Sequence, residues 1–347
     1  MTGKLVLEDG SVFIGESFGA NIPSSGELVF STGMVGYPES LTDPSYCGQI
    51  LILTYPLVGN YGVPAKASWE SGGIKVWGLV VSNYIDTPSH SQSKMTLSAW
   101  LKSEKIPALE IADTRLLAQK IREKGTMLGK IVFNKDTDFY DPNKENLIKI
   151  VSKKTVLIEG MSGKKHKKVL LIDCGVKESI KRCLLKRRIQ LIQVPADYDP
   201  FSGGQNFDGI VVSNGPGDPK MARTAIQTIK TGLKKRIPTL GICLGHQILA
   251  LASGGDTYKL KFGHRSQNQP CVLVDTPRCF ITSQNHGFAV GKIPPGFKNW
   301  FINANDGSNE GIIHKSGLFM SAQFHPEANP GPFDTEWIFD FFLSKLD

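Results

Sequence analysis

The feature that most constrains this fold is the alternation of apolar runs and helical patterns in the second half of the chain. The segments follow one another as strand 169–173, helix 178–187, strand 189–194, strand 208–213, helix 225–233 and strand 237–243. Strands that alternate with helices are typical of βαβ units, in which helices cover both faces of a parallel sheet. The second half is therefore predicted to be an α/β domain with a mostly parallel sheet.

The first half of the chain has a different pattern, dominated by short strands. Asp9-Gly10 is a hairpin signal between two apolar runs, and further strand-like runs lie at 27–30, 50–54 and 76–81. Two stretches with helical spacing follow these runs. This pattern predicts a mixed, β-rich α/β domain in front of the parallel one.

The regular pattern stops between the two halves, where Asp, Asn and Lys dominate and a Gly-Met-Ser-Gly stretch precedes a run of lysines. Such a composition is typical of a linker. A chain of 347 residues is long enough for two domains that each bury a core. We therefore predict a first domain at 1–153, a linker at 154–167 and a second domain at 168–347.

The chain has a net charge of +8, and much of it lies in short basic runs such as 164–168 and 234–236. Basic clusters can bind nucleic acid, but nucleic-acid surfaces usually interleave aromatic side chains with the cations. No aromatic residue interrupts these runs, and no nucleic-acid motif is present in the sequence. We therefore interpret the basic runs as solvated surface and expect no nucleic-acid partner.

The 6 cysteines show neither a CxxC pair nor the spacing of a metal site or a dense disulfide framework. No apolar run approaches the ~18 residues that a membrane-spanning helix needs. The N-terminal residues are not followed by the apolar segment of a secretory signal. These patterns predict a cytoplasmic protein with reduced thiols, no bound metal and no membrane contact.

A glycine-rich turn is the clearest candidate for chemistry. Gly241-Ile242-Cys243-Leu244-Gly245 lies between a predicted strand and a predicted helix, and G-x-nucleophile-x-G is the pattern of a nucleophile elbow. The N-terminus of the following helix favours the thiolate of Cys243, and the backbone N–H of Leu244 is placed to stabilise an oxyanion. A five-residue pattern is weak by itself, so a buried structural cysteine at a tight turn stays open as the alternative.

His325 is the candidate base for Cys243. Because residues i and i+2 of an extended segment point to the same side, Glu327 can hold the ring of His325. A thiol, an imidazole and an orienting carboxylate form a complete nucleophilic set. From the residues alone, His246 and His286 stay open as alternatives to His325.

Two further loops could line a site. The loop 213–219 follows a predicted strand and contains two glycines and two prolines, so its exposed N–H groups could bind a substrate or an oxyanion. The segment 284–288 is short and polar, with apolar runs on both sides. Each could equally be a plain turn, and composition does not decide between these readings.

Together these stretches are similar to the class I (triad) glutamine amidotransferases, and in particular to the amidotransferase component of carbamoyl-phosphate synthetases. The motifs at 241–247 and 324–327 are shared by the wider class, whereas those at 42–46 and 55–62 single out the carbamoyl-phosphate synthetase group. The resemblance covers nearly the whole chain. The matching stretches are 5–11, 32–46, 53–62, 213–219, 241–255, 262–270, 283–290 and 323–332.

The resemblance implies a flavodoxin-like class I amidotransferase domain behind a carbamoyl-phosphate synthetase small-subunit N-terminal domain. It implies that Cys243 attacks the side-chain amide of glutamine, that His325 moves the proton and that Glu327 orients His325. A γ-glutamyl thioester would form, ammonia would leave, and water would release glutamate. The glutamine-binding positions that the resemblance implies are Ser45, Gly215, Gly217, Leu244, Gln247, Asn285, Gly287 and Phe288.

The resemblance also implies a synthetase partner, either a large subunit or a fused synthetase domain. This partner would combine the ammonia with bicarbonate and ATP to make carbamoyl phosphate for pyrimidine or arginine synthesis. The sequence contains neither a GxxxxGK[ST] nor a GxGxxG phosphate loop. We therefore expect no cofactor in this chain and place ATP, magnesium and bicarbonate in the partner.

Two other classes of function stay open. A non-catalytic regulator that binds glutamine or the synthetase would share the fold, but it would usually lack one member of the nucleophilic set, which is complete here. A thiol hydrolase or peptidase would share the elbow but not the motifs of the first half.

The sequence leaves the architecture of the whole protein open. The segments 265–269 and 308–314 look more like the fused animal enzyme of pyrimidine synthesis than like a free-standing bacterial subunit. The chain stops at Asp347, where a fused protein would continue. Both a separate subunit and a domain excised from a fused protein are compatible with this pattern.

Overall fold

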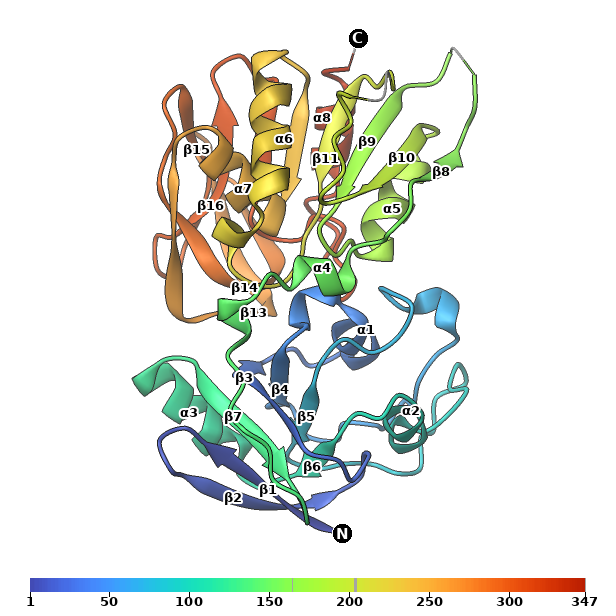
Figure 1. The fold of residues 1–347 in the computed structure, drawn as a ribbon, viewed down its shortest axis with the longest axis vertical. Coiled ribbons are helices and arrows are strands. Elements are labelled where there is room, and N and C mark those ends of the chain that lie inside the picture. Colours follow the sequence, from blue (N-terminus) through green and yellow to red (C-terminus); the bar gives the residue numbers. More distant parts are fainter. Residues whose placement is uncertain (164, 203–204, 347) are drawn as a thin grey trace. The chain divides into compact units, whose positions relative to one another are not determined.

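The computed structural model describes residues 1–163, 165–202 and 205–346 and divides into two compact units (Figure 1). The units are Met1–Glu145 with Lys261–Ser266, and Asn146–Leu260 with Gln267–Asp347. The predicted linker and second domain include some residues that lie outside the described ones, namely Lys164, Gly203, Gly204 and Asp347.

The first unit is built on a closed barrel in the strand order β1-β2-β6-β5-β4-β3-β7. Its strands are β1 (Thr2–Leu7), β2 (Val12–Ser17), β3 (Ser24–Ser31), β4 (Gln49–Leu53), β5 (Gly78–Val81), β6 (Ala108–Glu110) and β7 (Met127–Val132). Its helices are α1 (Tyr37–Thr42), α2 (Leu97–Ser103) and α3 (Thr114–Lys124), with the 3₁₀ turns η1 (Pro44–Tyr46), η2 (Lys66–Ser68) and η3 (Pro142–Lys144). The predicted β-rich α/β character of this half is confirmed.

The hairpin predicted at Asp9-Gly10 joins β1 to β2, with Val6 opposite Val12. Asp9 Oδ1 accepts a hydrogen bond from the backbone N–H of Ser11 at 3.1 Å. Gly10 has a φ of 84°, a conformation that glycine adopts without steric cost. The turn residues therefore help to set the register of the first two strands of the barrel.

The second unit is built on a 10-stranded sheet in the order β14-β13-β15-β16-β17-β12-β11-β9-β10-β8. Its strands are β8 (Leu157–Gly160), β9 (Lys168–Asp173), β10 (Gln190–Pro195), β11 (Gly209–Val212), β12 (Thr239–Ile242), β13 (Asp256–Leu273), β14 (Cys279–Lys292), β15 (Phe297–Asn303), β16 (Asn309–His314) and β17 (Phe319–Ala322). Its helices are α4 (Ile148–Val151), α5 (Glu178–Leu185), α6 (Arg223–Lys234), α7 (Leu244–Ala252) and α8 (Trp337–Leu343), with the 3₁₀ turn η4 (Pro219–Met221). The neighbours β10, β9, β11, β12 and β17 are parallel, as predicted, and the strands that flank them are antiparallel.

The segment 154–167, which the sequence predicts to be a linker, contains the strand β8. This strand pairs antiparallel with β10, with Ile158 opposite Ile192. The preceding residue Val156 packs against the apolar core on one face of the sheet. A short edge strand has few apolar residues, so its pairing with β10 leaves little periodic signal in the sequence.

The apolar side chains of the central strands alternate between two cores. Val169 and Leu171 of β9 pack in one cluster with side chains of α5 and α8. Leu170 and Ile172 pack in a second cluster with side chains of α6 and α7. Because successive side chains of a strand point to opposite faces, a strand that is buried on both faces is apolar throughout. The helices of this unit therefore cover both faces of its sheet (Figure 1).

An aromatic cluster closes the core on the face that α8 covers. Phe301 is fully buried, and its ring centroid lies 4.9 Å from that of Trp300, 5.0 Å from Phe324 and 6.3 Å from Trp337. Aromatic pairs at these separations add to the free energy of apolar burial. Phe324 directly precedes His325, so this cluster also anchors the segment that carries the candidate base.

No helix in the described ranges combines the length and the apolar character needed to cross a membrane. All six cysteines of the chain are described, and all of them are free.

We predict that Phe301→Ala lowers the free energy of unfolding of the second unit by about 3–5 kcal/mol, because it leaves a cavity at the centre of the aromatic cluster. Urea unfolding followed by far-ultraviolet circular dichroism measures the change. The control is Ile281→Ala on β14, where the side chain is 47% exposed and the expected change is within about 0.5 kcal/mol. Equal losses in both variants would contradict this assignment of the core.

Candidate active site

Cys243 lies in a strained turn between β12 and α7. Its backbone has φ 54° and ψ −104°, a region that residues with a side chain rarely adopt. A Cβ atom on Gly241 would collide with the carbonyl group of Gly245, and a Cβ atom on Gly245 would collide with that of Val212. The backbone N–H of Cys243 donates to the carbonyl oxygen of Ala322 at 2.8 Å. The turn therefore has the strained geometry of a nucleophile elbow.

Cys243 lies at the edge of the sheet where three neighbouring strands end. β11, β12 and β17 are parallel and adjacent, so the segments that follow them begin at the same edge. These segments are the loop 213–219, the elbow at Cys243 and the segment 323–327. The sheet order therefore brings together three stretches that are far apart in the sequence.

The imidazole of His325 is held by a carboxylate. His325 Nδ1 lies 2.6 Å from Glu327 Oε1, and both residues are buried. Nδ1 donates to the carboxylate, which leaves Nε2 as the atom that can exchange a proton. Nε2 makes no hydrogen bond of ordinary geometry with the described residues, although the Cys243 side chain lies close to the ring. Catalytic hydrogen bonds are often long before the substrate binds.

A third charged residue of the site, Lys177, was not predicted from the sequence. Its side chain is buried, and Nζ donates to Glu327 Oε1 at 3.1 Å and to the carbonyl oxygen of Ala328 at 2.7 Å. Its backbone N–H donates to Asn214 Oδ1 at 3.0 Å. The signal that could have found it is its position just after the strand predicted at 169–173, because residues after parallel strands gather at one edge of the sheet.

The three buried charges set one another's protonation. Burial and the charge of Lys177 lower the pKa of His325, but the charge and hydrogen bond of Glu327, together with the neighbouring Cys243 side chain, outweigh them and raise this pKa above its ordinary value. Burial raises the pKa of Glu327, but Lys177 and His325 outweigh burial and lower it. The carboxylate is therefore ionised and the imidazole holds its proton.

The structure separates the three histidines that the sequence left open. His246 is fully buried, and burial lowers its pKa to about 3, so its ring is neutral. His286 has its ring nitrogens 2.8 Å from the carbonyl oxygen of Phe288 and 3.2 Å from Gln284 Oε1. His325 lies beside the candidate nucleophile and is oriented by a carboxylate. The geometry therefore favours His325 as the base.

One group of the implied glutamine-binding residues lies along α7 and β14. Cys243 Sγ lies 3.6 Å from the carbonyl oxygen of Asn285. Gln247 Nε2 donates to the carbonyl oxygen of Phe288 at 2.8 Å. Asn285, Gly287 and Phe288 are consecutive or nearly consecutive residues of β14, so this stretch of β14 lies against the first turns of α7.

A second group surrounds the start of α7. A Cβ atom on Gly215 would collide with the carbonyl group of Cys174 and would lie 2.8 Å from the side chain of Leu244. Gly217 of the same loop has a φ of 86°, which favours glycine. The loop after β11 therefore lies against the elbow. Ser45 belongs to the first unit, where it is buried in η1.

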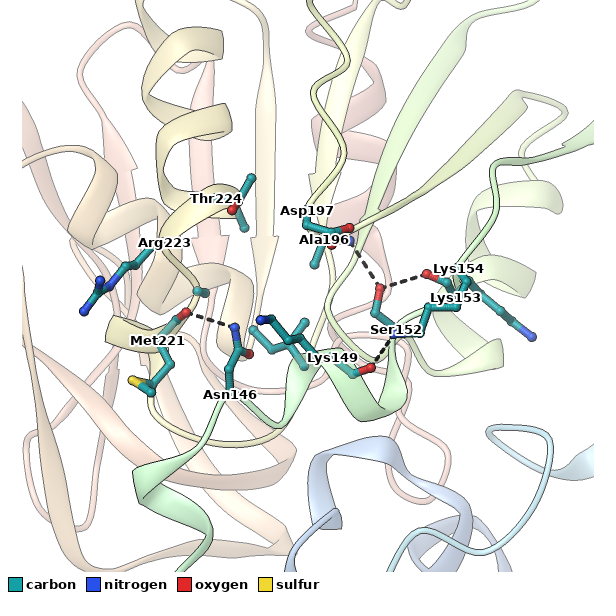
Figure 2. Close-up of a pocket in the computed structure, with 13 residues that line it drawn as sticks. Asn146, Lys149, Ser152, Lys153, Lys154, Ala196, Asp197, Met221, Arg223 and Thr224 are labelled. Carbon is teal, nitrogen blue, oxygen red and sulfur yellow. Dashed lines mark hydrogen bonds between the residues drawn. The ribbon is translucent and has the colours of Figure 1, made fainter.

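Two cavities open on the second unit. One, of about 250 Å³, is lined by Glu327 and by residues of α5 that include Cys183. The other, of about 240 Å³, lies between α4 and the first turn of α6, and it is lined by residues that include Lys149 and Thr224 (Figure 2). None of the three candidate catalytic residues lines the second cavity. The candidate site is therefore identified by its chemistry and not by this cavity.

Comparison with known proteins gives the family of the chain. Residues 5–131 match the family described as carbamoyl-phosphate synthase small chain, CPSase domain, and residues 170–345 match glutamine amidotransferase class-I. The carbamoyl phosphate synthase small chain of Pyrococcus furiosus is 46% identical over 99% of this chain and 98% of that protein. This chain belongs to the carbamoyl-phosphate synthase small-chain family.

Relatives of this chain occur both as separate chains and within longer proteins. The arginine-specific small chain of Neurospora crassa is 45% identical over 98% of this chain and 79% of that protein. The multifunctional protein CAD of Squalus acanthias is 49% identical over 98% of this chain, but over only 16% of its own length. The chain thus spans between 16% and 21% of the length of the multifunctional relatives that it matches, and 21% in the case of pyr-3 of Neurospora crassa.

The family match divides the candidate residues of this chain between its two units. Cys243, His325, Glu327 and Lys177 all fall within 170–345, the amidotransferase part. Ser45 falls within 5–131, the part that matches the CPSase domain. The roles of these residues in glutamine hydrolysis belong to the proposal below.

We predict that Lys177→Met lowers the free energy of unfolding of the second unit by about 3–5 kcal/mol, because it removes one of the two cations that face the buried Glu327 carboxylate. Urea unfolding measures the loss. The control is Lys186→Met, which removes an ion pair from a lysine side chain that is 72% exposed and is expected to change stability by less than about 1 kcal/mol. A loss at Lys177 no larger than that at Lys186 would count against the buried ion pair.

The raised pKa of His325 makes stability depend on pH. A group that binds its proton more tightly in the folded state contributes stability that is complete below its unfolded pKa of about 6.5 and is lost as pH rises through the folded value. We therefore expect the difference in free energy of unfolding between the parent and His325→Gln to be largest near pH 6 and to shrink steadily above pH 7. Urea unfolding at stepped pH measures it, and a difference that grows with pH would disprove the assignment.

Proposed function

We propose that this chain is the glutamine-hydrolysing component of a carbamoyl-phosphate synthase (EC 6.3.5.5). The observation that carries the proposal is the buried line from Lys177 through Glu327 to His325, beside Cys243 at the carboxyl edge of the parallel sheet. Cys243 supplies the nucleophile, His325 carries the proton, and the charge of Glu327 orients His325. Membership of the family supports glutamine as the substrate.

In the proposed reaction, Cys243 Sγ forms a bond to the side-chain amide carbon of glutamine. The oxyanion that develops is stabilised by the backbone N–H of Leu244, because the first N–H groups of a helix have no acceptor within the helix. His325 then gives the proton on Nε2 to the amide nitrogen, the C–N bond breaks, and ammonia leaves. Glu327 keeps the ring of His325 oriented through Nδ1 while this proton moves.

The second half of the reaction releases glutamate. His325, now neutral, takes a proton from water, and the oxygen attacks the carbonyl carbon of the γ-glutamyl thioester. The C–S bond breaks, Cys243 leaves as the thiolate, and the glutamate carboxyl group loses its proton to solvent. The protonated imidazole and the thiolate are thereby restored, which agrees with the raised pKa that Glu327, working against burial, gives to His325.

Glutamine is proposed to bind mainly through backbone groups and a few fixed side chains. Glycine positions suit this role because they allow a ligand to approach the main chain closely, and the amide and α-amino ends of glutamine need both donors and acceptors. The proposed contacts are Ser45, Gly215, Gly217, Leu244, Gln247, Asn285, Gly287 and Phe288.

The ammonia is proposed to pass to a synthetase partner, either a separate large subunit or a domain fused to this one. The proposal is supported by relatives of both kinds, namely separate small chains and multifunctional proteins. ATP, magnesium and bicarbonate would bind the partner, and the carbamoyl phosphate would enter pyrimidine or arginine synthesis. We also propose a cytoplasmic location, which the six free cysteines support.

The proposed function predicts that 6-diazo-5-oxo-norleucine, an electrophilic glutamine mimic, labels Cys243 alone and that excess glutamine blocks the labelling. Peptide mass spectrometry locates the adduct. Cys243→Ser is expected to lower the rate of glutamate release by about 10³-fold or more, whereas the control Cys279→Ser, at an exposed cysteine, leaves it unchanged.

Two other outcomes would point elsewhere. Labelling that spreads over several cysteines but spares Cys243, with glutamine binding intact, would favour a regulatory protein. Turnover of simple esters or peptides without preference for glutamine would favour a general thiol hydrolase.

A further inference from the structure

The side-chain amide of Gln247 has both of its hydrogens engaged. Gln247 is buried one helical turn after Cys243, on α7. Its Nε2 donates to the carbonyl oxygen of Phe288 at 2.8 Å and to Oε1 of Gln323 at 2.9 Å. Because an amide nitrogen carries two hydrogens, these two bonds use its whole donor capacity.

These two contacts fix which way round the amide lies. The carbonyl oxygen of Phe288 can only accept a hydrogen bond, so the atom of Gln247 that faces it must be the nitrogen. A half-turn of the amide would place two carbonyl oxygens against each other. Gln323 must then present its own oxygen to Gln247, and its Nε2 is left buried without a partner among the described residues.

The orientation leaves the side-chain oxygen of Gln247, Oε1, for a ligand. This oxygen has no hydrogen-bond partner within the described part of the chain. It is also not fully buried, so a ligand can reach it. An amide oxygen can only accept, so it suits a donor of the ligand. Residues i and i+4 of a helix share a face, which places Gln247 on the side of α7 that carries Cys243.

Of the groups on glutamine, the α-ammonium is the donor that suits this oxygen. The side-chain nitrogen must stay free to leave once Cys243 attacks, and the α-carboxylate has no hydrogen to donate. A hydrogen bond from a charged donor is also stronger than one between neutral groups. The α-ammonium is four bonds from the amide carbon of glutamine, so it can reach one helical turn along α7, about 5.4 Å.

We propose that Gln323 is a positioning residue that holds the amide of Gln247 so that Oε1 accepts from the α-ammonium of glutamine. The inference rests on the proposed glutaminase function. Gln323 acts through Gln247 and does not itself touch the substrate. It thereby makes the site select substrates that carry an α-amino group.

The position of Gln323 suits this role. Its side chain is fully buried, and its backbone N–H donates to the carbonyl oxygen of Glu310 at 2.8 Å. It lies two residues before His325, so one short segment after β17 orients both the base and the partner of Gln247. Without the acceptor on Gln323, one hydrogen of Gln247 would lose its partner, and the amide would be held by the carbonyl oxygen of Phe288 alone.

The test compares Gln323→Met, which keeps the size of the side chain but removes the acceptor, with Gln323→Glu, which keeps an acceptor oxygen whether or not it is protonated. Each variant is assayed for glutamine hydrolysis and for inhibition by 4-carbamoylbutanoate, which is glutamine without its α-amino group. Using the analogue as an inhibitor means that its own turnover is not required. Thermal unfolding followed by circular dichroism shows whether each variant is folded.

We expect Gln323→Met to raise KM for glutamine by about tenfold, the effect of losing one hydrogen bond to a charged group, with kcat changed by less than about threefold. The inhibition constant of 4-carbamoylbutanoate should change by less than about twofold, since it lacks the group that Gln247 binds. Gln323→Glu should restore KM for glutamine to near the parent value.

A rise of the same size for glutamine and for the analogue in Gln323→Met would overturn the proposal, because it would show only a structural role. So would a Gln323→Glu variant that is folded but as impaired as Gln323→Met. A parent protein that shows no glutamine hydrolysis and no labelling of Cys243 would instead refute the proposed function, which separates the two failures.

Discussion

The candidate site depends on one constraint, namely that the parallel strands at the centre of the second unit all end at the same edge of the sheet. Lys177 follows β9, the loop 213–219 follows β11, Cys243 follows β12 and His325 follows β17. Each strand is held by its neighbours and by helices on both faces, so its end can move little. The pairing of the strands therefore holds residues that are far apart in the chain close together at one edge of the sheet.

The charges in this site are costly, and their arrangement offsets the cost. Moving an ion from water into a protein interior costs several kcal/mol even after relaxation. Lys177, Glu327 and His325 are all buried, yet each charge faces a charge of opposite sign or a backbone oxygen. The carboxylate at the centre is the common partner of both cations. The contact between Glu327 and His325 Nδ1 therefore favours the ionised carboxylate and the protonated imidazole, and it fixes the direction of His325 Nε2.

Polar groups with no charge are fixed in the same way. The strained backbone at Cys243 is held by its hydrogen bond to Ala322, and the amide of Gln247 is held by Phe288 and Gln323. Groups whose orientation is already set need little reorganisation when a substrate binds. The aromatic cluster around Phe301 also helps to fix the position of His325, because Phe324 packs in this cluster and directly precedes His325.

The sequence by itself determined the features that depend on neighbouring residues. The apolar alternation from 169 onward determined the parallel core, the Asp9-Gly10 pair determined the first hairpin, and the glycines around Cys243 marked the elbow. Tertiary structure alone decided which histidine faces Cys243, that Lys177 completes the buried ion line, that β8 joins the sheet and that Gln323 orients Gln247. The physical reason is that periodicity and turn chemistry act over a few residues, whereas these contacts join segments whose proximity arises only once the strands have paired.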